Sequence, residues 1–152
     1  MKCLLGLIFA FTFTTATACE CQFLSMRQNY QKADFVLRVH VLSLQDTVQY
    51  DLYSQPIFPP FQAGSHATVR VQQVFKGRIP RGSLVLTGMG SMCDFRFKRN
   101  GDYVVFLYKQ AVNKQGYYVT SRCQRHFSLD DSAAWQEFAQ ARESVKQNLS
   151  PH

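Results

Sequence analysis

The sequence lacks the short motifs that usually reveal catalytic and metal sites. It has no C-x-x-C pair, no H-x-x-x-H pair and no glycine–lysine phosphate loop, and no serine or cysteine has a recognisable nucleophile context. The four histidines stand apart from one another along the chain. We therefore expect no enzyme activity and no cofactor. Asp130 and Asp131 are better explained as a helix cap than as catalytic carboxylates.

Hydrophobic runs long enough to cross a membrane are also missing. The run from Leu4 to Phe13 is too short for a bilayer. With Lys2 before it and the small residues Ala16–Ala18 after it, the run has the layout of a secretory signal peptide that is cleaved after Ala18. The sequence therefore predicts a signal peptide at residues 1–18. Residues 19–152 are expected to form a single secreted, extracellular domain without a membrane anchor.

Cleavage after Ala18 makes Cys19 the first residue of the mature protein and leaves its α-amine free. The competing interpretation is a bacterial lipid-attachment cysteine. Such sites usually carry leucine three residues before the cysteine, where this chain has Ala16. Acylation would block the amine, so the two interpretations exclude each other.

Acidic residues are scarce relative to basic ones. The chain has 17 Lys and Arg against 10 Asp and Glu, which gives a formal net charge of +7. Of these charged residues, Lys2 alone lies in the signal peptide. This excess predicts attraction to acidic surfaces such as sulfated glycans or anionic extracellular matrix, and a merely solvated basic face is the alternative. Export argues against nucleic acid as a partner. The basic residues form two loose groups, Lys76, Arg78 and Arg81, and Arg96, Lys98 and Arg99.

Cysteines remain in an even number once Cys3 leaves with the signal peptide. The four are Cys19, Cys21, Cys93 and Cys123. In an exported chain of this size they predict two disulfides, for which three pairings exist, and a bond between Cys19 and Cys21 is the least favourable because it would close a strained ring. A metal site at the Cys-x-Cys pair is the alternative. The isolated histidines and the oxidising compartment argue against it.

Short apolar runs between turn residues predict a mainly β fold. In residues 34–44 apolar side chains alternate with Arg38 and His40, which is typical of a half-buried strand. Five segments of this kind are expected to form a small barrel. They are residues 34–44, 66–77, 83–87, 102–108 and 117–121.

Two further segments predict helices at the ends of the domain. Ser25–Lys32 is expected to form a short N-terminal helix. Near the C-terminus, Asp130 and Asp131 can cap a helix whose apolar stripe packs against the barrel. The residues of that stripe are Ala134, Phe138, Ala141 and Val145, with Trp135 beside them.

The connection at residues 45–65 is long for a link between two strands. It contains Tyr50, Tyr53, Phe58 and Phe61 together with three prolines. Loops of this length are usually functional or disordered, and the aromatics argue against disorder. Two interpretations stay open, a stiffened binding surface or a long hairpin that folds back on its own barrel.

The arrangement of these segments resembles the inhibitory domain of the tissue inhibitors of metalloproteinases. The resemblance rests on the terminal Cys19-Glu20-Cys21, the short helix after it, Ala-Asp-Phe-Val-Leu-Arg-Val-His-Val at 33–41 and Val-Phe-Lys-Gly at 74–77. It extends from Cys19 to about Val145. The strand and turn motifs also occur in the wider netrin-like superfamily, so they indicate the fold. The Cys-x-Cys behind the signal peptide is more specific to the inhibitors.

This resemblance implies a five-stranded OB-like, netrin-like barrel with disulfides Cys19–Cys93 and Cys21–Cys123. It implies a secreted inhibitor of a zinc metalloproteinase, in which the α-amine and carbonyl of Cys19 chelate the catalytic zinc of the protease. The expected protease contacts are Cys19, Glu20, Cys21, Ser91, Met92, Tyr50 and Tyr53. The alternative function is a non-inhibitory netrin-like module that binds extracellular matrix or sulfated glycans.

The chain departs from that family at three points. Glu20 stands where the inhibitors commonly carry a small hydroxylated residue, and its carboxylate would enter the first primed pocket of the protease. The third disulfide of the inhibitory domain and the cysteine-rich C-terminal domain are both missing. Functions that depend on the second domain are therefore not expected here.

Overall fold

The computed structural model describes residues 21–22, 24–45, 64–79, 82–89 and 93–148, together with the backbone of residues 47–50 and 56–62. Two sheets and two α-helices make up this part of the chain. No helix within these ranges is long and apolar enough to span a membrane.

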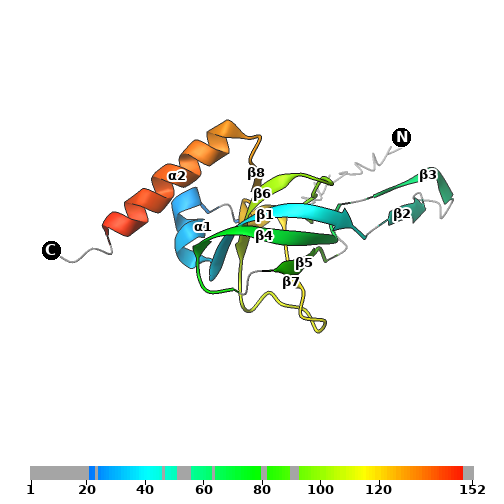
Figure 1. Cartoon of the computed structure of the whole chain (residues 1–152), viewed down its shortest axis with the longest axis horizontal. Coiled ribbons are helices and arrows are strands. Elements are labelled where there is room, and N and C mark those ends of the chain that lie inside the picture. The colour runs from blue at the N-terminus through cyan, green and yellow to red at the C-terminus, as the bar shows by residue number, and fades with distance from the viewer. Residues whose placement is uncertain are drawn as a thin grey trace, which may run out of the picture.

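A curled six-stranded sheet forms the centre of the molecule (Figure 1). Its strand order is β7-β5-β4-β1-β6-β8, and its neighbours are antiparallel except for the parallel pair β5 and β7. The six strands are β1 (Phe35–Leu44), β4 (Ala67–Lys76), β5 (Ser83–Thr87), β6 (Asp102–Leu107), β7 (Tyr118–Val119) and β8 (Phe127–Ser128). The long central strands β1 and β4 therefore organise the sheet, and the two-residue strands β7 and β8 lie at its edges.

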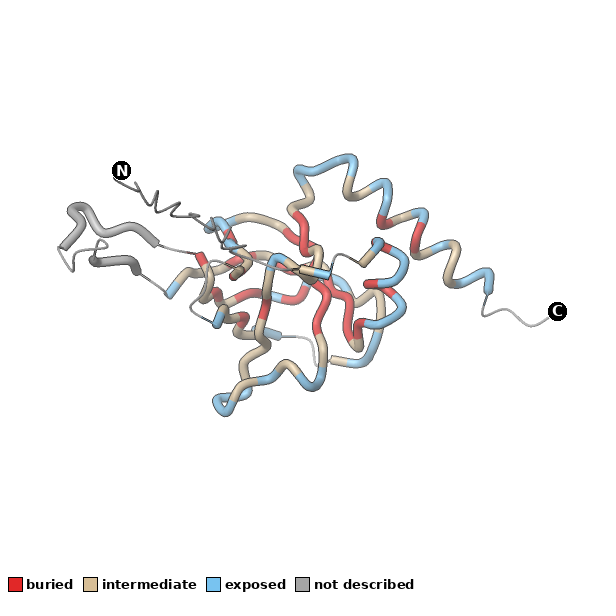
Figure 2. The backbone as a smooth tube through the Cα atoms, turned by 180° about the vertical axis from the view of Figure 1, so that it is seen from behind, coloured by how far each residue is buried: buried red, intermediate tan, exposed pale blue. Residues whose placement is uncertain are grey.

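Both faces of the central strand β1 contribute to a hydrophobic core. On one face its alternating residues Phe35, Leu37, Val39 and Val41 pack with Leu86, Phe97 and Val105 from other parts of the chain. On the opposite face Val36 packs with Val104, Phe106 and residues of both helices. The buried residues accordingly run through the middle of the sheet and along the inner side of the C-terminal helix (Figure 2).

The two helices lie together on that second face. In α1 (Met26–Lys32), Ser25 caps the first turn through a capping box with Gln28. In α2 (Ser132–Gln147), the side chain of Asp131 accepts a hydrogen bond from the backbone N–H of Ala134. Phe138 of α2 is fully buried and contacts the rings of Tyr30, Phe75, Phe106, Phe127 and Trp135. The predicted helices and the packing role of the C-terminal stripe are confirmed.

The predicted strands are all present, with ends that differ from the prediction by at most two residues. The sheet nevertheless has six strands where the sequence predicted five, because Phe127–Ser128 pairs with β6 as β8. The long connection at residues 45–65 contains a second, two-stranded sheet of β2 (Thr47–Tyr50) and β3 (Pro56–Gln62). This hairpin extends away from the main sheet (Figure 1). The connection thus forms a hairpin, as the second interpretation expected, but the hairpin does not fold back on the main sheet.

Candidate functional site

The beginning of the described chain is fixed to the sheet by a disulfide. Cys21 is bonded to Cys123, with 5.2 Å between their Cα atoms and a sequence separation of 102. Cys123 lies in η1, the 3-10 helix Arg122–Gln124, so the bond joins the segment before α1 to the segment between β7 and β8. In the chain-entropy treatment, closing a loop of this length stabilises the fold by ~4–5 kcal/mol. The predicted Cys21–Cys123 pairing is confirmed.

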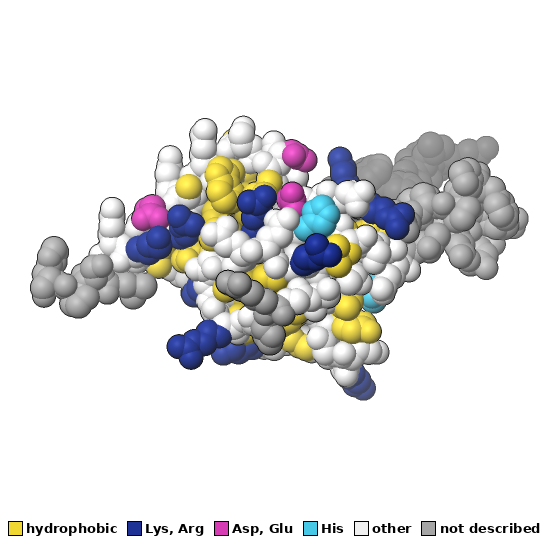
Figure 3. Space-filling view, viewed as in Figure 1, with side chains coloured by type: hydrophobic (Ala, Val, Ile, Leu, Met, Phe, Trp, Pro, Cys, Tyr) yellow, Lys and Arg dark blue, Asp and Glu magenta, His cyan; other side chains and the backbone are white. Residues whose placement is uncertain are grey.

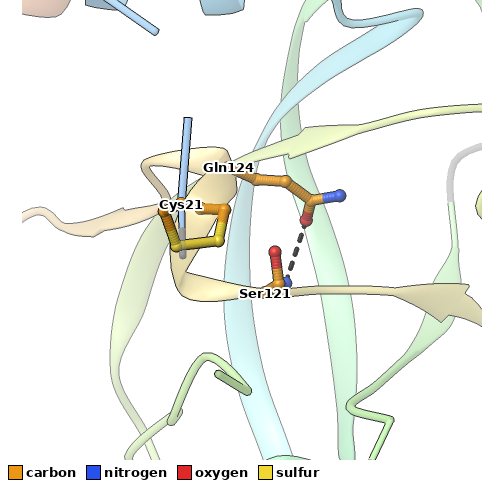
Figure 4. The surroundings of a disulfide bond; sticks show 4 residues. Cys21, Ser121 and Gln124 are labelled. Carbon is orange, nitrogen blue, oxygen red and sulfur yellow. Dashed lines mark hydrogen bonds between the residues drawn. A yellow bond between two sulfur atoms is a disulfide. The ribbon is translucent and has the colours of Figure 1, made fainter. Parts of the chain in front are cut away.

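A hydrogen-bond network around the buried ring of His126 supports the turn that carries Cys123. The backbone N–H of Ser121 donates to Oε1 of Gln124 across 3.0 Å (Figure 4). The same oxygen lies 2.8 Å from Nε2 of His126, and Nδ1 of His126 accepts from the backbone N–H of Phe106 across 3.1 Å. Because Nδ1 accepts, the proton of the neutral ring sits on Nε2, which donates to Gln124. Burial lowers the pKa of His126 to about 3, so the ring stays neutral at physiological pH.

Cys93 lies beside the same turn. Its carbonyl accepts a hydrogen bond from the backbone N–H of Arg122 across 2.8 Å, and the next residue, Asp94, forms a β-bridge with Ser121. Cys93 is itself disulfide-bonded. The chain therefore brings the segments of Cys21, Cys93 and Cys123 together at one place. The predicted partner of Cys93, Cys19, is outside the described residues, so the Cys19–Cys93 pairing stays a prediction.

A buried carboxylate, that of Asp94, holds the backbone at the start of the segment before Cys93. Asp94 is only 2% exposed, and its Oδ1 accepts the backbone N–H of Met89 across 2.8 Å. Gly88 has no room for a side chain, since a Cβ there would lie 2.3 Å from the Asp94 carboxylate. Met89, in contrast, is 77% exposed, the most exposed large apolar side chain of the part that the structure describes. A solvent-facing methionine on a restrained backbone is well suited to contact a partner.

The structure places the predicted contact residues unevenly. Cys21 lies at the disulfide described above. Tyr50 belongs to β2, of which the backbone alone is described. Cys19, Glu20, Tyr53, Ser91 and Met92 fall outside the described residues. The flanking residues 88–89 and 93–94 do have defined positions, so the two ends of the segment that contains Ser91 and Met92 are known.

Sequence reasoning did not identify Asp94, Met89 or His126 as part of this region. A carboxylate directly after Cys93 looks like any surface residue in the sequence, and its burial depends on contacts with Gly88 and Met89 that no spacing rule predicts. For His126, the one available signal was its position three residues after Cys123.

No group of three or more His, Cys, Asp or Glu residues within the described ranges could hold a metal ion. No protein-family model matches the chain. A search of curated proteins likewise finds no similar sequence.

Proposed function

We propose that this protein is a secreted inhibitor of zinc metalloproteinases that binds the catalytic zinc of its target through the N-terminal amine and carbonyl of Cys19. The observation that carries the proposal is the Cys21–Cys123 disulfide, which fixes the chain two residues after the proposed zinc-binding residue. The side-by-side placement of Cys93 and the Cys123 turn supports it, because a Cys19–Cys93 bond would fix the terminus at a second point of the same region.

Fixing a chain terminus matters for binding because free termini fray. An unrestrained N-terminus would lose conformational entropy when it entered a protease cleft, and that loss would weaken the complex. With two disulfides in place, the terminus is ordered before the partner arrives, and this cost is met during folding. The Cys21–Cys123 bond supplies one of these two restraints.

The chemistry of a terminal residue suits a catalytic zinc ion. An α-amine nitrogen and the carbonyl oxygen of the same residue can form a five-membered chelate ring, and a catalytic zinc keeps one position open for water. A free α-amine has a pKa of about 7.7–8.0, so it loses its proton to a metal at low cost near neutral pH. Cys19 would displace the water that the protease needs for hydrolysis.

The remaining contacts would flank the terminus. Glu20 would point toward the first primed pocket, and Ser91 and Met92 would approach from the segment before Cys93. Met89, which is exposed and held by Asp94, lies at the start of that segment. These groups would extend the contact beyond the metal and set the choice of protease.

An inhibition assay tests the proposal directly. The mature chain is expected to inhibit at least one member of a panel of zinc metalloproteinases and to compete with a small active-site zinc chelator for the same enzyme. A serine protease that cleaves a comparable substrate is the control and should keep its activity. Inhibition that does not respond to the chelator, or no inhibition across the panel, would contradict the proposal and favour the non-inhibitory module.

A further inference from the structure

One face of the central sheet carries a basic group that the proposed inhibitory region does not use. Arg38 and His40 are two residues apart on β1, so their side chains share the face of the sheet that lies opposite the Leu37–Val39 core. His40 pairs directly across the ladder with Arg70 of β4. Arg38, His40 and Arg70 therefore form one contiguous surface, which we call the basic face.

The helices leave the basic face uncovered. Val36, also on this face of β1, is fully buried against residues of α1 and α2. Two and four residues further along, Arg38 and His40 are partly exposed, and Arg70 is exposed. Basic side chains and a histidine are visible over β1 and β4 on the side seen in Figure 1 (Figure 3). The helical layer thus ends before it reaches these residues.

The two arginines of the basic face have no acidic partner within the described part of the chain. Elsewhere Arg125 pairs with Glu137, and Arg142 pairs with Glu143. Asp102, the carboxylate at the rim of the basic face, lies 2.9 Å from Nδ1 of His40. The Nε atom of Arg38 is buried and makes no hydrogen bond. Neither Arg38 nor Arg70 is thus neutralised by a carboxylate of the described residues.

The spacing of the arginines suits a tetrahedral anion. Residues in diagonal positions on neighbouring strands are about 7–8 Å apart, a distance that two long side chains can close from both sides. A guanidinium offers a planar fork of N–H donors that matches two oxygens of one sulfate or phosphate group. Arg38 and Arg70 could therefore hold one such group between them, or two successive groups along β1.

A second basic element lies beside the end of β1. The turn before β6 is joined to β1, since the backbone N–H of Asn100 donates to the carbonyl of Val41 across 3.1 Å. Lys98 and Arg99 in this turn are exposed. Exposed positive charge is thus also present at a turn that is joined to β1, where it would add to the attraction of a polyanion.

We propose that the basic face, Arg38, His40 and Arg70, is a binding site for the sulfate groups of an extracellular sulfated glycan. The open, strand-lined surface suits a linear chain better than a small ion, and the excess of basic residues over the whole sequence attracts such a polymer from a distance. The proposal is independent of the inhibitory region, because none of its residues belongs to the Cys21, Cys93 and Cys123 segments.

The basic group around Lys76, which the sequence suggested, is a poorer candidate for a sulfate-binding site than the basic face. The ammonium of Lys76 donates to the carbonyls of Tyr30 and Gln31 across 2.8 and 2.7 Å, at the C-terminal end of α1. Burial lowers the pKa of Lys76. This side chain is therefore committed to the helix end, where a cation is stabilised by the exposed carbonyls.

Heparin binding by matched charge variants tests the proposal. The double variant Arg38→Gln/Arg70→Gln is compared with Arg78→Gln/Lys114→Gln, which removes the same charge from exposed positions outside the basic face. At an ionic strength of about 0.15 M we expect the first variant to lose heparin affinity at least ~10-fold and the control less than ~3-fold. An equal loss in the two variants, or full retention by the first, would overturn the site.

Two further comparisons complete the test. If Arg38→Gln/Arg70→Gln does not fold, as judged by circular dichroism, Arg70→Gln alone is compared with Arg78→Gln alone, since both side chains are exposed. Desulfated heparin should bind more weakly than heparin, and equal binding would overturn the role of sulfate. Tighter binding to phosphatidylserine vesicles than to heparin would assign the face to a membrane surface and overturn the glycan proposal.

Discussion

Met89 donates its backbone N–H to the buried carboxylate of Asp94, five residues further along the chain, across 2.8 Å. The bond joins the two ends of the segment that precedes Cys93. It also explains Gly88, since any larger residue there would occupy the space of the carboxylate. The candidate inhibitory region is therefore held both by a disulfide, at Cys21, and by a charge-assisted hydrogen bond, at Asp94.

Removing the hydrogen-bond acceptor at Asp94 should lower the free energy of unfolding more than removing its charge alone. Asp94→Ala leaves the partly buried N–H of Met89 without its acceptor, and we expect a loss of about 1–3 kcal/mol in the free energy of unfolding. Asp94→Asn is the matched variant, because its amide oxygen can still accept, and it should lose less. Urea unfolding measures both. Equal stability of parent and Asp94→Ala would show that the bond does not hold the segment.

Acid should destabilise the protein through His126. Because burial lowers the pKa of this ring to about 3, the unfolded chain takes up the proton first as the pH falls. The stability that depends on neutral His126 is complete above the ordinary histidine pKa of about 6.5. It is lost toward pH 3, by about 1.4 kcal/mol per pH unit and by about 5 kcal/mol in all.

The variant His126→Asn isolates this effect. Its amide oxygen can take the place of Nδ1 as acceptor for the N–H of Phe106, but the side chain does not titrate. Urea unfolding at several pH values should give a flatter dependence for the variant than for the parent. Identical slopes for the two proteins would remove His126 as the source of acid sensitivity.

Removing the Cys21–Cys123 bond should affect stability and inhibition together. For Cys21→Ser/Cys123→Ser we expect a loss of about 2–5 kcal/mol in the free energy of unfolding, measured by denaturant titration. Inhibition should weaken even under conditions where the variant stays folded, because the terminal segment would no longer be ordered before binding. A folded variant that inhibits as well as the parent would show that pre-ordering by this bond is not required.

Glu20 provides a test of the contact next to the zinc. A carboxylate without a partner in an apolar pocket costs several kcal/mol, so Glu20→Thr should tighten inhibition of metalloproteinases whose first primed pocket is apolar. Glu20→Gln is the control, since it removes the charge and keeps the length. If neither substitution changes the inhibition constant, the residue does not enter the pocket.

The sequence predicted the central strands well because their signal is local. The alternation of Leu37, Val39 and Val41 with Arg38 and His40 corresponds to the two faces that the structure shows. The C-terminal helix was predicted for the same reason, from its aspartate cap and the spacing of Phe138 and its neighbours. In contrast, β8 has only two residues and exists through its pairing with β6, so no periodicity could reveal it.

The candidate region was less accessible to sequence reasoning because it depends on contacts between distant segments. The Cys21–Cys123 pairing came from the family resemblance, since four cysteines alone leave three pairings open. The roles of Asp94 and Lys76 follow from burial and from hydrogen bonds to backbone groups far along the chain or around a turn. Such residues look like ordinary surface charges until the fold places them.

The most direct test of the central claim is the inhibition constant of a variant with one alanine added before Cys19, measured against a metalloproteinase that the mature parent inhibits. The addition turns the proposed zinc-binding amine into an amide, which has no usable lone pair, while both disulfides can still form. We expect inhibition to fall by ~100-fold or more, and a variant with one alanine added after His152 to match the parent. Full inhibition by the N-terminally extended protein would contradict zinc binding through Cys19.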